Sequence, residues 1–329
     1  MKALVVASGF ALASREPIEK MQEQGIQVLE HDYGPGGLND NPDEFCRIIK
    51  DADILIATGL ERIPRKILAA SRNLKMVALR GAGFDKLDLE AATELGILGT
   101  HNPGANRQSV ADMALGLMLS VGRRIAWMDR GMRSGEYNEM RVKSKDLTGS
   151  TVGIIGLGRI GKETALRARA FSTRVIYHDL LDYQEFAGKH GIEKVTLDYL
   201  LSVSDFVSIH LPLDESTRRL IGRDALEKMK SSAVLVNTAR GGIVDEKEVC
   251  IVLKKGHLYG YGVDVFEEEP PVDNALLQLD NVLSTPHMAG VSENAMHQMA
   301  MATADKVICF MIDGKIPEDV LNPEVINKL

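Results

Sequence analysis

The chain has 329 residues, of which 45% are hydrophobic and 26% charged, and its formal net charge at pH 7 is -7. A single hydrophobic core seldom grows beyond about 250 to 300 residues, so a chain of this length predicts two domains. A protein whose main partner is nucleic acid normally presents a basic face, which an acidic chain does not favour. Composition and charge therefore indicate a two-domain globular protein and argue against a nucleic-acid partner.

The cysteines and the N-terminal segment indicate the compartment. Cys46, Cys250 and Cys309 lie far apart and lack the CxxC or mixed His/Cys spacing of a metal site, so we expect buried thiols, a reducing compartment and no metal. Residues 1–17 are more typical of a strand turning into a helix than of a signal peptide. No apolar run is long enough to span a membrane. We therefore expect a cytoplasmic protein without a membrane partner.

Short apolar runs alternate with amphipathic stretches in the first hundred residues, a pattern typical of strand–helix units around a parallel sheet. Asn41 followed by Pro42 predicts a helix start, because an Asn side chain can cap free backbone N–H groups and proline suits the first turn. Pro64 predicts the start of the next helix. The expected strands are 2–8, 26–31, 52–58, 74–80 and 97–100.

Residues 106–124 predict one long helix, because apolar residues recur there at helical spacing. Met118 and Leu119 make the other face apolar as well, so the helix must be buried on several sides. A domain junction or a subunit interface would bury it, and so would an ordinary core. The apolar positions on the first face are Val110, Met113, Ala114, Leu117 and Val121.

A second series of alternating strands and helices comes next, which is typical of a complete nucleotide-binding unit. A helix over 158–171 separates its first two strands, and the last predicted helix of the chain covers 292–312. The expected strands are 151–156, 174–179, 205–210, 233–238, 259–265 and 281–285.

The glycine pattern Gly156-x-Gly158-x-x-Gly161 begins where a strand ends and opens a helix, with Arg159 and Ile160 between its glycines. Gly156 allows the tight turn, Gly158 lets the backbone approach a pyrophosphate, and Gly161 lets helix and strand pack closely. The phosphates would then meet free N–H groups at the positive end of the helix dipole. The pattern predicts a dinucleotide site, and a glycine turn without a ligand is the alternative.

Asp179 ends the next strand, 18 positions after the last of these glycines. A carboxylate there accepts hydrogen bonds from the adenosine ribose hydroxyls and repels a 2′-phosphate. Asp179 therefore favours NAD over NADP as the cofactor. Its alternative role is that of a loop or cap residue.

These motifs resemble the D-isomer-specific 2-hydroxyacid dehydrogenases, a family that includes phosphoglycerate dehydrogenase and the glyoxylate/hydroxypyruvate reductases. The match runs nearly end to end, in the family's order. It includes "RGAGFDKLDLEAA", "SVADMALGLML", "LTGSTVGIIGLGRIGK", "VSIHLPLDEST", "MKSSAVLVNTARGGIVDE", "YGVDVFEEEP" and "TPHMAG".

The resemblance implies an α/β fold of two Rossmann-like domains, with parallel sheets flanked by helices. It implies that an NAD-binding domain over 102–287 is inserted into a smaller substrate domain made of 1–101 and 288–329. It also implies a homodimer formed mainly by the helix near 106–124. Within these 329 residues it leaves no room for an appended regulatory domain.

The resemblance assigns the catalytic chemistry to Arg240, Glu269 and His287. Arg240 stands directly after a predicted strand, and its planar fork can hold a substrate carboxylate and keto oxygen. His287 would donate a proton to the carbonyl oxygen as hydride arrives, or accept one from the alcohol. The alternatives are a structural salt bridge for Arg240 and a capping or core role for His287.

We expect Glu269 to orient His287 and to favour its protonated form, since a carboxylate beside an imidazole stabilises the imidazolium. Reduction should then decline at high pH and oxidation at low pH. Glu267 and Glu268, the neighbouring acids, are interpreted as solvated.

The resemblance assigns further residues to the binding of substrate and cofactor. Backbone N–H groups of Ala82 and Gly83 would hold the substrate carboxylate, whereas Arg80 would either contact an anionic tail or cap a neighbouring acid. Asp264 would meet the nicotinamide carboxamide, and His210 has a structural alternative. The implied cofactor contacts beyond the glycine loop and Asp179 are His210, Pro212, Thr217, Thr238, Ala239 and Asp264.

The sequence leaves the substrate open among 3-phosphoglycerate, glycerate/hydroxypyruvate and glycolate/glyoxylate. Lys86 and Asp112 depart from residues common in parts of the family, which bears on this choice. The predicted partner is a small 2-oxo or 2-hydroxy acid. The alternative function is that of an NAD(H)-responsive, corepressor-like binding protein on the same fold.

Overall fold

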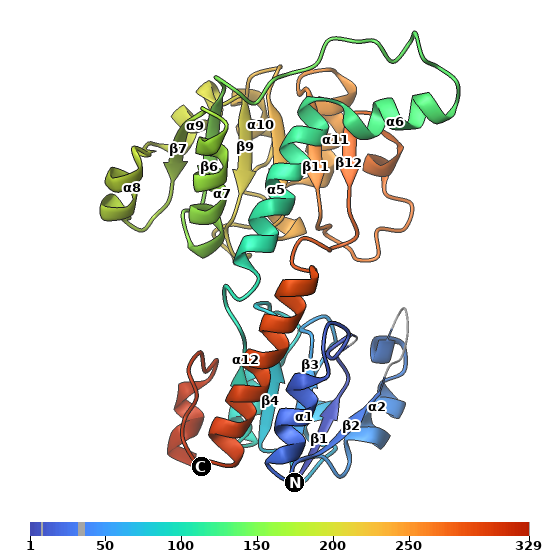
Figure 1. The fold of residues 1–329 in the computed structure, drawn as a ribbon, viewed down its shortest axis with the longest axis vertical. Coiled ribbons are helices and arrows are strands. Elements are labelled where there is room, and N and C mark those ends of the chain that lie inside the picture. Colours follow the sequence, from blue (N-terminus) through green and yellow to red (C-terminus); the bar gives the residue numbers. More distant parts are fainter. Residues whose placement is uncertain (8, 32–36, 329) are drawn as a thin grey trace. The chain divides into compact units, whose positions relative to one another are not determined.

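The structure is a computed structural model that describes residues 1–7, 9–31 and 37–328. The chain forms two compact units (Figure 1). Unit 1 comprises residues 1–106 and 291–329, and unit 2 comprises Arg107–Gly290, so the divisions fall a few residues beyond the expected 101 and 287. Within the described residues, no helix is long and apolar enough to cross a membrane.

Unit 1 contains a five-stranded parallel sheet in the order β2-β1-β3-β4-β5, the strand order of flavodoxin-like folds. All five predicted strands are confirmed, although each is shorter than expected; residue 8, at the end of the first one, lies outside the described residues. The strands are β1 (Lys2–Val5), β2 (Gln27–Glu30), β3 (Ile54–Ala57), β4 (Met76–Leu79) and β5 (Leu98–Thr100).

Alternate side chains of this sheet enter two different cores, because successive residues of a strand point to opposite faces. Leu4 and Leu55 pack with α2, α3 and α4, whereas Ala3 and Ile54 pack with α1 and α12. Asn41 caps α2 as predicted, since its Oδ1 accepts the Glu44 N–H at 3.2 Å. The helices are α1 (Glu16–Glu23), α2 (Pro42–Ile49), α3 (Arg65–Leu68), α4 (Leu89–Glu94) and α12 (Glu293–Met311), with 3-10 turns η1 (Gly37–Asp40) and η4 (Pro323–Lys328).

Helix α12 confirms the predicted last helix and packs in unit 1 against residues that lie far from it in the sequence. Its residues Ala300, Ala304 and Val307 lie in the same core as Ile18 of α1, and α12 runs beside α1 in Figure 1. Ser292 caps it by accepting the Ala295 N–H at 3.2 Å. The chain therefore returns to unit 1 after completing unit 2.

Unit 2 contains a seven-stranded parallel sheet in the order β12-β11-β10-β9-β6-β7-β8. The first strand of the unit, β6, lies between β7 and β9, so the sheet is wound outward in both directions from the β6/β9 pair. This is the doubly wound order of dinucleotide-binding folds. The strands are β6 (Thr151–Ile155), β7 (Arg174–His178), β8 (Glu193–Lys194), β9 (Phe206–Ile209), β10 (Val234–Asn237), β11 (Gly260–Val263) and β12 (Val282–Ser284).

Helices cover both faces of the seven-stranded sheet. Ile154 packs with α5 and α7 on the face toward the viewer in Figure 1, while Ile155 packs with α9, α10 and α11 on the other face. The remaining helices lie at the surface or the edge. The helices of unit 2 are α5 (Arg107–Gly122), α6 (Ile125–Arg133), α7 (Arg159–Ala170), α8 (Gln184–His190), α9 (Leu197–Val203), α10 (Arg223–Lys228) and α11 (Glu246–Lys254), with 3-10 turns η2 (Gly241–Ile243) and η3 (Ala275–Gln278).

Helix α5 confirms the long helix predicted near 106–124, and its own unit buries most of its surface. Ala114, Leu117 and Met118 lie in the core shared with β6, β7 and α7. A narrow stripe that includes Asp112 and Gly116 is exposed. Packing within unit 2 therefore accounts for most of the apolar character of this helix.

Candidate active site

The carboxyl ends of the parallel strands of unit 2 meet at one edge of the sheet, where open α/β sheets bind their ligands. Every predicted site residue of this unit lies in the connection after one of these strands, in the loop itself or, for Arg159, Ile160 and Gly161, in the first turn of α7. The glycine loop comes after β6, Asp179 after β7, His210 after β9, Thr238 to Arg240 after β10, Asp264 after β11, and Thr285 to His287 after β12.

The glycine loop adopts the conformation that its sequence predicts. Gly156 has φ +92°, and a Cβ there would lie 2.8 Å from the His210 carbonyl oxygen. A Cβ on Gly161 would lie 2.0 Å from the Gly156 carbonyl oxygen, so helix and strand approach as closely as their backbones allow. Gly158 caps α7 and faces open space, as a backbone that must approach a phosphate requires.

Asp179 braces the same loop. Its Oδ2 accepts the Leu157 N–H at 2.7 Å and its Oδ1 accepts the Leu181 N–H at 2.8 Å. Leu180 and Leu181 beside it are 89% and 63% exposed. The carboxylate therefore joins β7 to the glycine loop and lies at an open, apolar part of the surface.

The loop after β9 is held by its own side chains. The Thr217 hydroxyl donates to the Pro212 carbonyl at 2.7 Å and accepts the Asp214 N–H at 2.8 Å. His210 Nε2 lies 3.0 Å from Ser208 Oγ, and burial of the ring lowers the pKa of His210 to about 3. His210 is therefore neutral at physiological pH.

The loop after β10 presents Thr238, Ala239 and Arg240. Buried Asn237 clamps it, because its Nδ2 donates to the Arg240 carbonyl at 2.8 Å and its Oδ1 accepts the Ala239 N–H at 3.0 Å. Arg240 is half-buried and donates from Nη1 to the Ala239 carbonyl at 2.7 Å. Within the described part of the chain, the buried Thr238 hydroxyl has no hydrogen-bond partner, so it remains available to a ligand.

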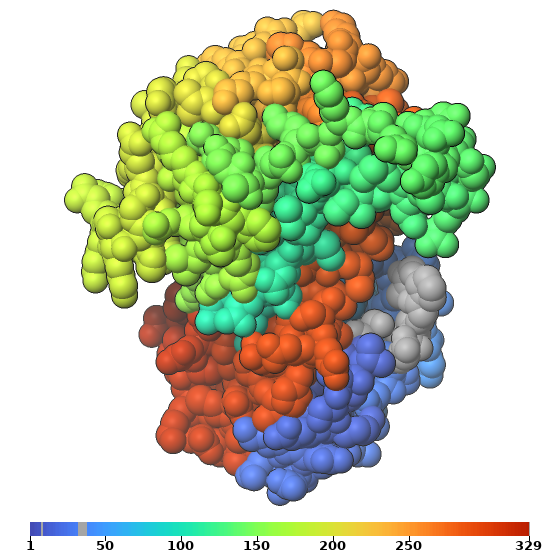
Figure 2. All heavy atoms as spheres, turned by 45° about the horizontal axis from the view of Figure 1, so that its top comes forward, coloured from blue at the N-terminus to red at the C-terminus, as the bar shows by residue number. Residues whose placement is uncertain are grey.

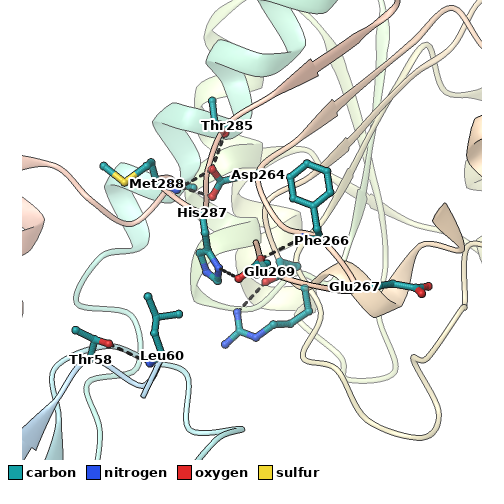
Figure 3. Close-up of polar contacts among 12 residues, drawn as sticks. Thr58, Leu60, Asp264, Phe266, Glu267, Glu269, Thr285, His287 and Met288 are labelled. Carbon is teal, nitrogen blue, oxygen red and sulfur yellow. Dashed lines mark hydrogen bonds and ion pairs between the residues drawn. The ribbon is translucent and has the colours of Figure 1, made fainter. Parts of the chain in front are cut away.

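His287 and Glu269 form a direct pair (Figure 3). His287 Nδ1 lies 2.8 Å from Glu269 Oε2, and Glu269 Oε1 accepts the Phe266 N–H at 3.1 Å. The two side chains are 33% and 26% exposed. Because the carboxylate contacts Nδ1, the Nε2 atom is the ring nitrogen that this pair leaves uncommitted.

The loops that carry Arg240 and Glu269 touch each other. A Cβ on Gly241 would lie 2.0 Å from the carbonyl carbon of Phe266, so only glycine allows this approach. Glu246 of α11 ties down the second loop, since it accepts the Glu267 N–H at 2.5 Å and the Asn274 amide at 2.7 Å. Burial raises the pKa of Glu246. Together with the His287–Glu269 contact, these approaches join the loops after the adjacent strands β10, β11 and β12 at one edge.

The predicted substrate loop lies in unit 1, after β4. Arg80 is 7% exposed, and burial lowers the pKa of its guanidinium, an effect that Glu61 partly offsets. Ala82 O lies 2.8 Å from His101 Nδ1, while the Asn102 amide donates to the carbonyls of Leu79 and Arg80, each at 3.1 Å. Two side chains that come after β5 therefore set the shape of this loop.

Sequence reasoning did not single out Asn237, Asn102 or His101. A buried Asn at a strand end, next to residues that turn, is a detectable signal for a loop clamp. The partners of His101 are distant residues, which no local pattern reveals. Within residues 1–7, 9–31 and 37–328, no group of three or more His, Cys, Asp or Glu side chains is placed to hold a metal ion.

A doubly wound sheet with a glycine loop at its winding point, and an imidazole–carboxylate pair at the same edge, defines a dinucleotide-dependent dehydrogenase. The family model for the D-isomer specific 2-hydroxyacid dehydrogenase, NAD binding domain, matches residues 115–289. The chain belongs to this family and is an NAD-dependent oxidoreductase that interconverts a D-2-hydroxy acid and its 2-oxo acid.

Known proteins resemble the chain over nearly its whole length. It is 40% identical over 316 residues to a glyoxylate reductase of Korarchaeum cryptofilum, which covers 93% of this chain and 95% of that protein. It is also 40% identical to a D-3-phosphoglycerate dehydrogenase of Methanocaldococcus jannaschii, with 92% of this chain but only 58% of that protein covered. The crystal structure of a glyoxylate reductase from Paecilomyes thermophila has a TM-score of 0.84 at 30% identity and covers 98% of each chain. All three are described as enzymes, so they lend no support to the corepressor-like alternative.

Proposed function

We propose that Arg240, Glu269 and His287 are the catalytic residues and that the protein reduces a small 2-oxo acid with NADH. Bound NADH supplies the hydride that the carbonyl carbon receives. Arg240 holds the substrate carboxylate and keto oxygen with its planar fork, and His287 gives the proton on Nε2 to the carbonyl oxygen. Glu269 holds the ring through Nδ1 and stabilises the imidazolium before the transfer.

The 2.8 Å contact between His287 and Glu269 carries this proposal. A histidine that served only as a cap or as core would not need a carboxylate bound to one nitrogen while the other stays available. In the reverse direction His287 accepts the proton of the hydroxyl group as the carbon loses its hydride, so the same pair serves both directions.

For the cofactor, we infer that the glycine loop holds the pyrophosphate and that Asp179 holds the adenosine ribose. Open space at Gly158 and the buried, unpartnered Thr238 hydroxyl support this inference. Asp179 favours NAD because a 2′-phosphate would meet its negative charge. The further contacts in the proposal are Arg159, Ile160, Gly156, Gly161, His210, Pro212, Thr217 and Ala239.

We propose that unit 2 is the NAD-binding domain and that unit 1 is the substrate domain, with Ala82 and Gly83 holding the carboxylate through backbone N–H groups. The near-complete burial of Arg80 favours a structural role for its side chain over the binding of a phosphate tail. Glyoxylate or hydroxypyruvate is therefore the proposed substrate class, and 3-phosphoglycerate is the alternative.

We also propose a cytoplasmic homodimer that uses the exposed stripe of α5 together with the segment 123–146. This segment lies at the surface of unit 2, in green in Figure 2. Its apolar side chains Ile125, Met132 and Tyr137 are 52%, 49% and 57% exposed, and apolar surface gathered on one segment can mark an interface. A pocket of about 290 Å³ beside α6 adjoins it. Light scattering should give twice the chain mass of 36.0 kDa, and a monomer would contradict the proposal.

The catalytic proposal is tested by assays of NADH oxidation at 340 nm with glyoxylate, hydroxypyruvate and phosphohydroxypyruvate. His287→Ala should lower kcat by about 10²–10⁴-fold, the usual worth of a general acid. NADH binding, monitored by fluorescence, should be retained in the variant and so shows that it is folded. Near-normal turnover by His287→Ala would disprove the proposed role.

A further inference from the structure

Two consecutive carbonyl groups of the loop after β4 bond to the same short segment. The Gly81 carbonyl accepts the Asn102 N–H at 2.9 Å, and the Ala82 carbonyl oxygen lies 2.8 Å from His101 Nδ1. A carbonyl oxygen only accepts hydrogen bonds, so Nδ1 of this ring carries a proton and donates it. The segment 101–102, directly after β5, therefore holds both carbonyls from one side.

These two contacts fix the directions of the next two N–H groups. The peptide bonds between residues 81 and 83 are trans, and in a planar trans peptide the C=O of one residue and the N–H of the next point in opposite directions. The N–H groups of Ala82 and Gly83 therefore point away from the segment 101–102. Within residues 1–7, 9–31 and 37–328, neither of them donates to another group of the protein. Successive N–H groups in such a turn can bind an anion.

The loop after β3 supports the same turn from its backbone. A Cβ on Gly59 would collide with the Gly83 carbonyl oxygen, and one on Gly81 would lie 2.9 Å from the Thr58 carbonyl oxygen. The Thr58 hydroxyl accepts the Leu60 N–H at 3.0 Å and so holds the supporting loop in shape (Figure 3). These supports are backbone contacts, whereas the contact from His101 comes from a side chain that a substitution can remove.

The imidazole of His101 is itself anchored. Its ring meets the Phe84 ring in a T-shaped contact, with the centroids 5.4 Å apart and the planes at 90°. Lys306 of α12 donates to the His101 carbonyl and pairs with Asp319 at 2.9 Å. Ring and main chain are thus held separately, so the donor on Nδ1 keeps its direction.

We propose that His101 is a positioning residue: by donating from Nδ1 to the Ala82 carbonyl, its ring aims the Gly83 N–H at the substrate carboxylate. The proposal rests on the proposed function, in which Ala82 and Gly83 hold that carboxylate. The hydrogen bond also polarises the peptide group that the two residues share, which makes its N–H a stronger donor. His101 therefore acts on the affinity for the acid and not on the transfer of hydride or proton.

The test compares His101→Phe with His101→Asn in the full chain, by steady-state kinetics with glyoxylate and hydroxypyruvate. Phe keeps a ring against Phe84 but has no donor, whereas Asn has no ring but places its Nδ2 where His has Nδ1. We expect His101→Phe to raise KM by about 5- to 20-fold and to leave kcat within about threefold, because it weakens an interaction present in ground and transition state alike. His101→Asn should bring KM back to within about threefold of the wild-type value.

Two results would overturn the proposal. One is a wild-type KM in His101→Phe, and the other is a KM that His101→Asn fails to restore, because the ring itself and not its donor would then matter. His101→Leu, which also lacks a donor, covers the case in which His101→Phe does not fold, and it should raise KM to the same extent. The matched control is His31→Phe, which replaces an exposed histidine of the same unit and should keep wild-type values.

Two binding measurements separate this proposal from the proposed function. The Kd for NADH, from fluorescence titration, should stay within about twofold in every variant, because only the hold on the acid changes. Oxamate has the carboxylate of a 2-oxo acid but is not reduced, so its inhibition constant should rise in parallel with KM. If the wild type reduces none of these acids, the proposed function fails. If it reduces them and both KM and the oxamate constant are unchanged in His101→Phe, only the role of His101 is wrong.

Discussion

Unit 1 and unit 2 share one architecture and differ in the residues at the carboxyl ends of their strands. Both are parallel sheets with helices on two faces. In unit 2 the carboxyl edge carries partly exposed polar side chains, such as half-buried Arg240 and the His287–Glu269 pair, to which we assign chemical roles. In unit 1 the corresponding edge carries a loop whose arginine, Arg80, is almost fully buried. The fold places the carboxyl ends of the strands at one edge of each sheet. The residues after each strand then determine whether that edge can bind a ligand or take part in a reaction.

The largest expected effect contrasts the two arginines. Arg240→Lys should lower kcat/KM for glyoxylate by about 10²–10³-fold, because an ammonium cannot hold a carboxylate in a planar fork. Arg80→Lys, the matched variant in unit 1, should lower it by at most about tenfold. Steady-state kinetics on both variants measures the contrast. An equal loss in the two would mean that unit 1 contributes a side chain of comparable importance to substrate binding.

A smaller effect is expected from Glu269→Gln, which keeps the shape of the side chain but removes its charge. The amide is a weaker, uncharged acceptor for the ring at Nδ1, so it holds the proposed proton donor less firmly and kcat for reduction should fall. At neutral pH we expect a loss of about tenfold. Glu268→Gln serves as the control, because this neighbouring acid is exposed. A wild-type kcat in Glu269→Gln, measured by steady-state kinetics, would remove Glu269 from the mechanism.

The smallest effect concerns stability at the same edge. Burial lowers the pKa of His210 to about 3 from its ordinary 6.5, so between these values the unfolded chain binds a proton that the folded chain does not. The folded state therefore loses stability as pH falls below about 6.5. His210→Gln should reduce the drop in Tm between pH 7 and pH 5, by a modest amount because the residue is only half-buried. An unchanged drop would show that His210 does not contribute to the acid sensitivity.

Local patterns predicted most strands and helices of both units, because the spacing of apolar residues that marks a strand or a helix lies within a few neighbouring residues. The strands after which the site residues stand, the cap at Asn41 and the helices α5 and α12 were all predicted this way. Strand β8 was not, since its two residues Glu193 and Lys194 are exposed and give no apolar signal. The apolar surface of α5 was predicted to be buried, but only the structure showed that its own unit buries most of it.

The site shows the same division. The spacing of the three glycines and Asp179 predicted the glycine loop, because this spacing is typical of the turn that binds a dinucleotide. The clamps were missed for two reasons. Asn237 binds residues only two and three positions later but was not singled out, whereas Asp264 binds a turn that comes more than twenty residues later, which no local pattern reveals.

The sequence by itself determined the alternation of strands and helices, the glycine loop and the identity of the side chain after each strand, because these depend on interactions between near neighbours. Only the tertiary structure decided that β10, β11 and β12 lie side by side, that Asp264 grips the turn of His287, and that α12 joins the first unit. Strand order and distant hydrogen bonds result from the packing free energy of the whole sheet, to which residues far apart in the chain contribute together.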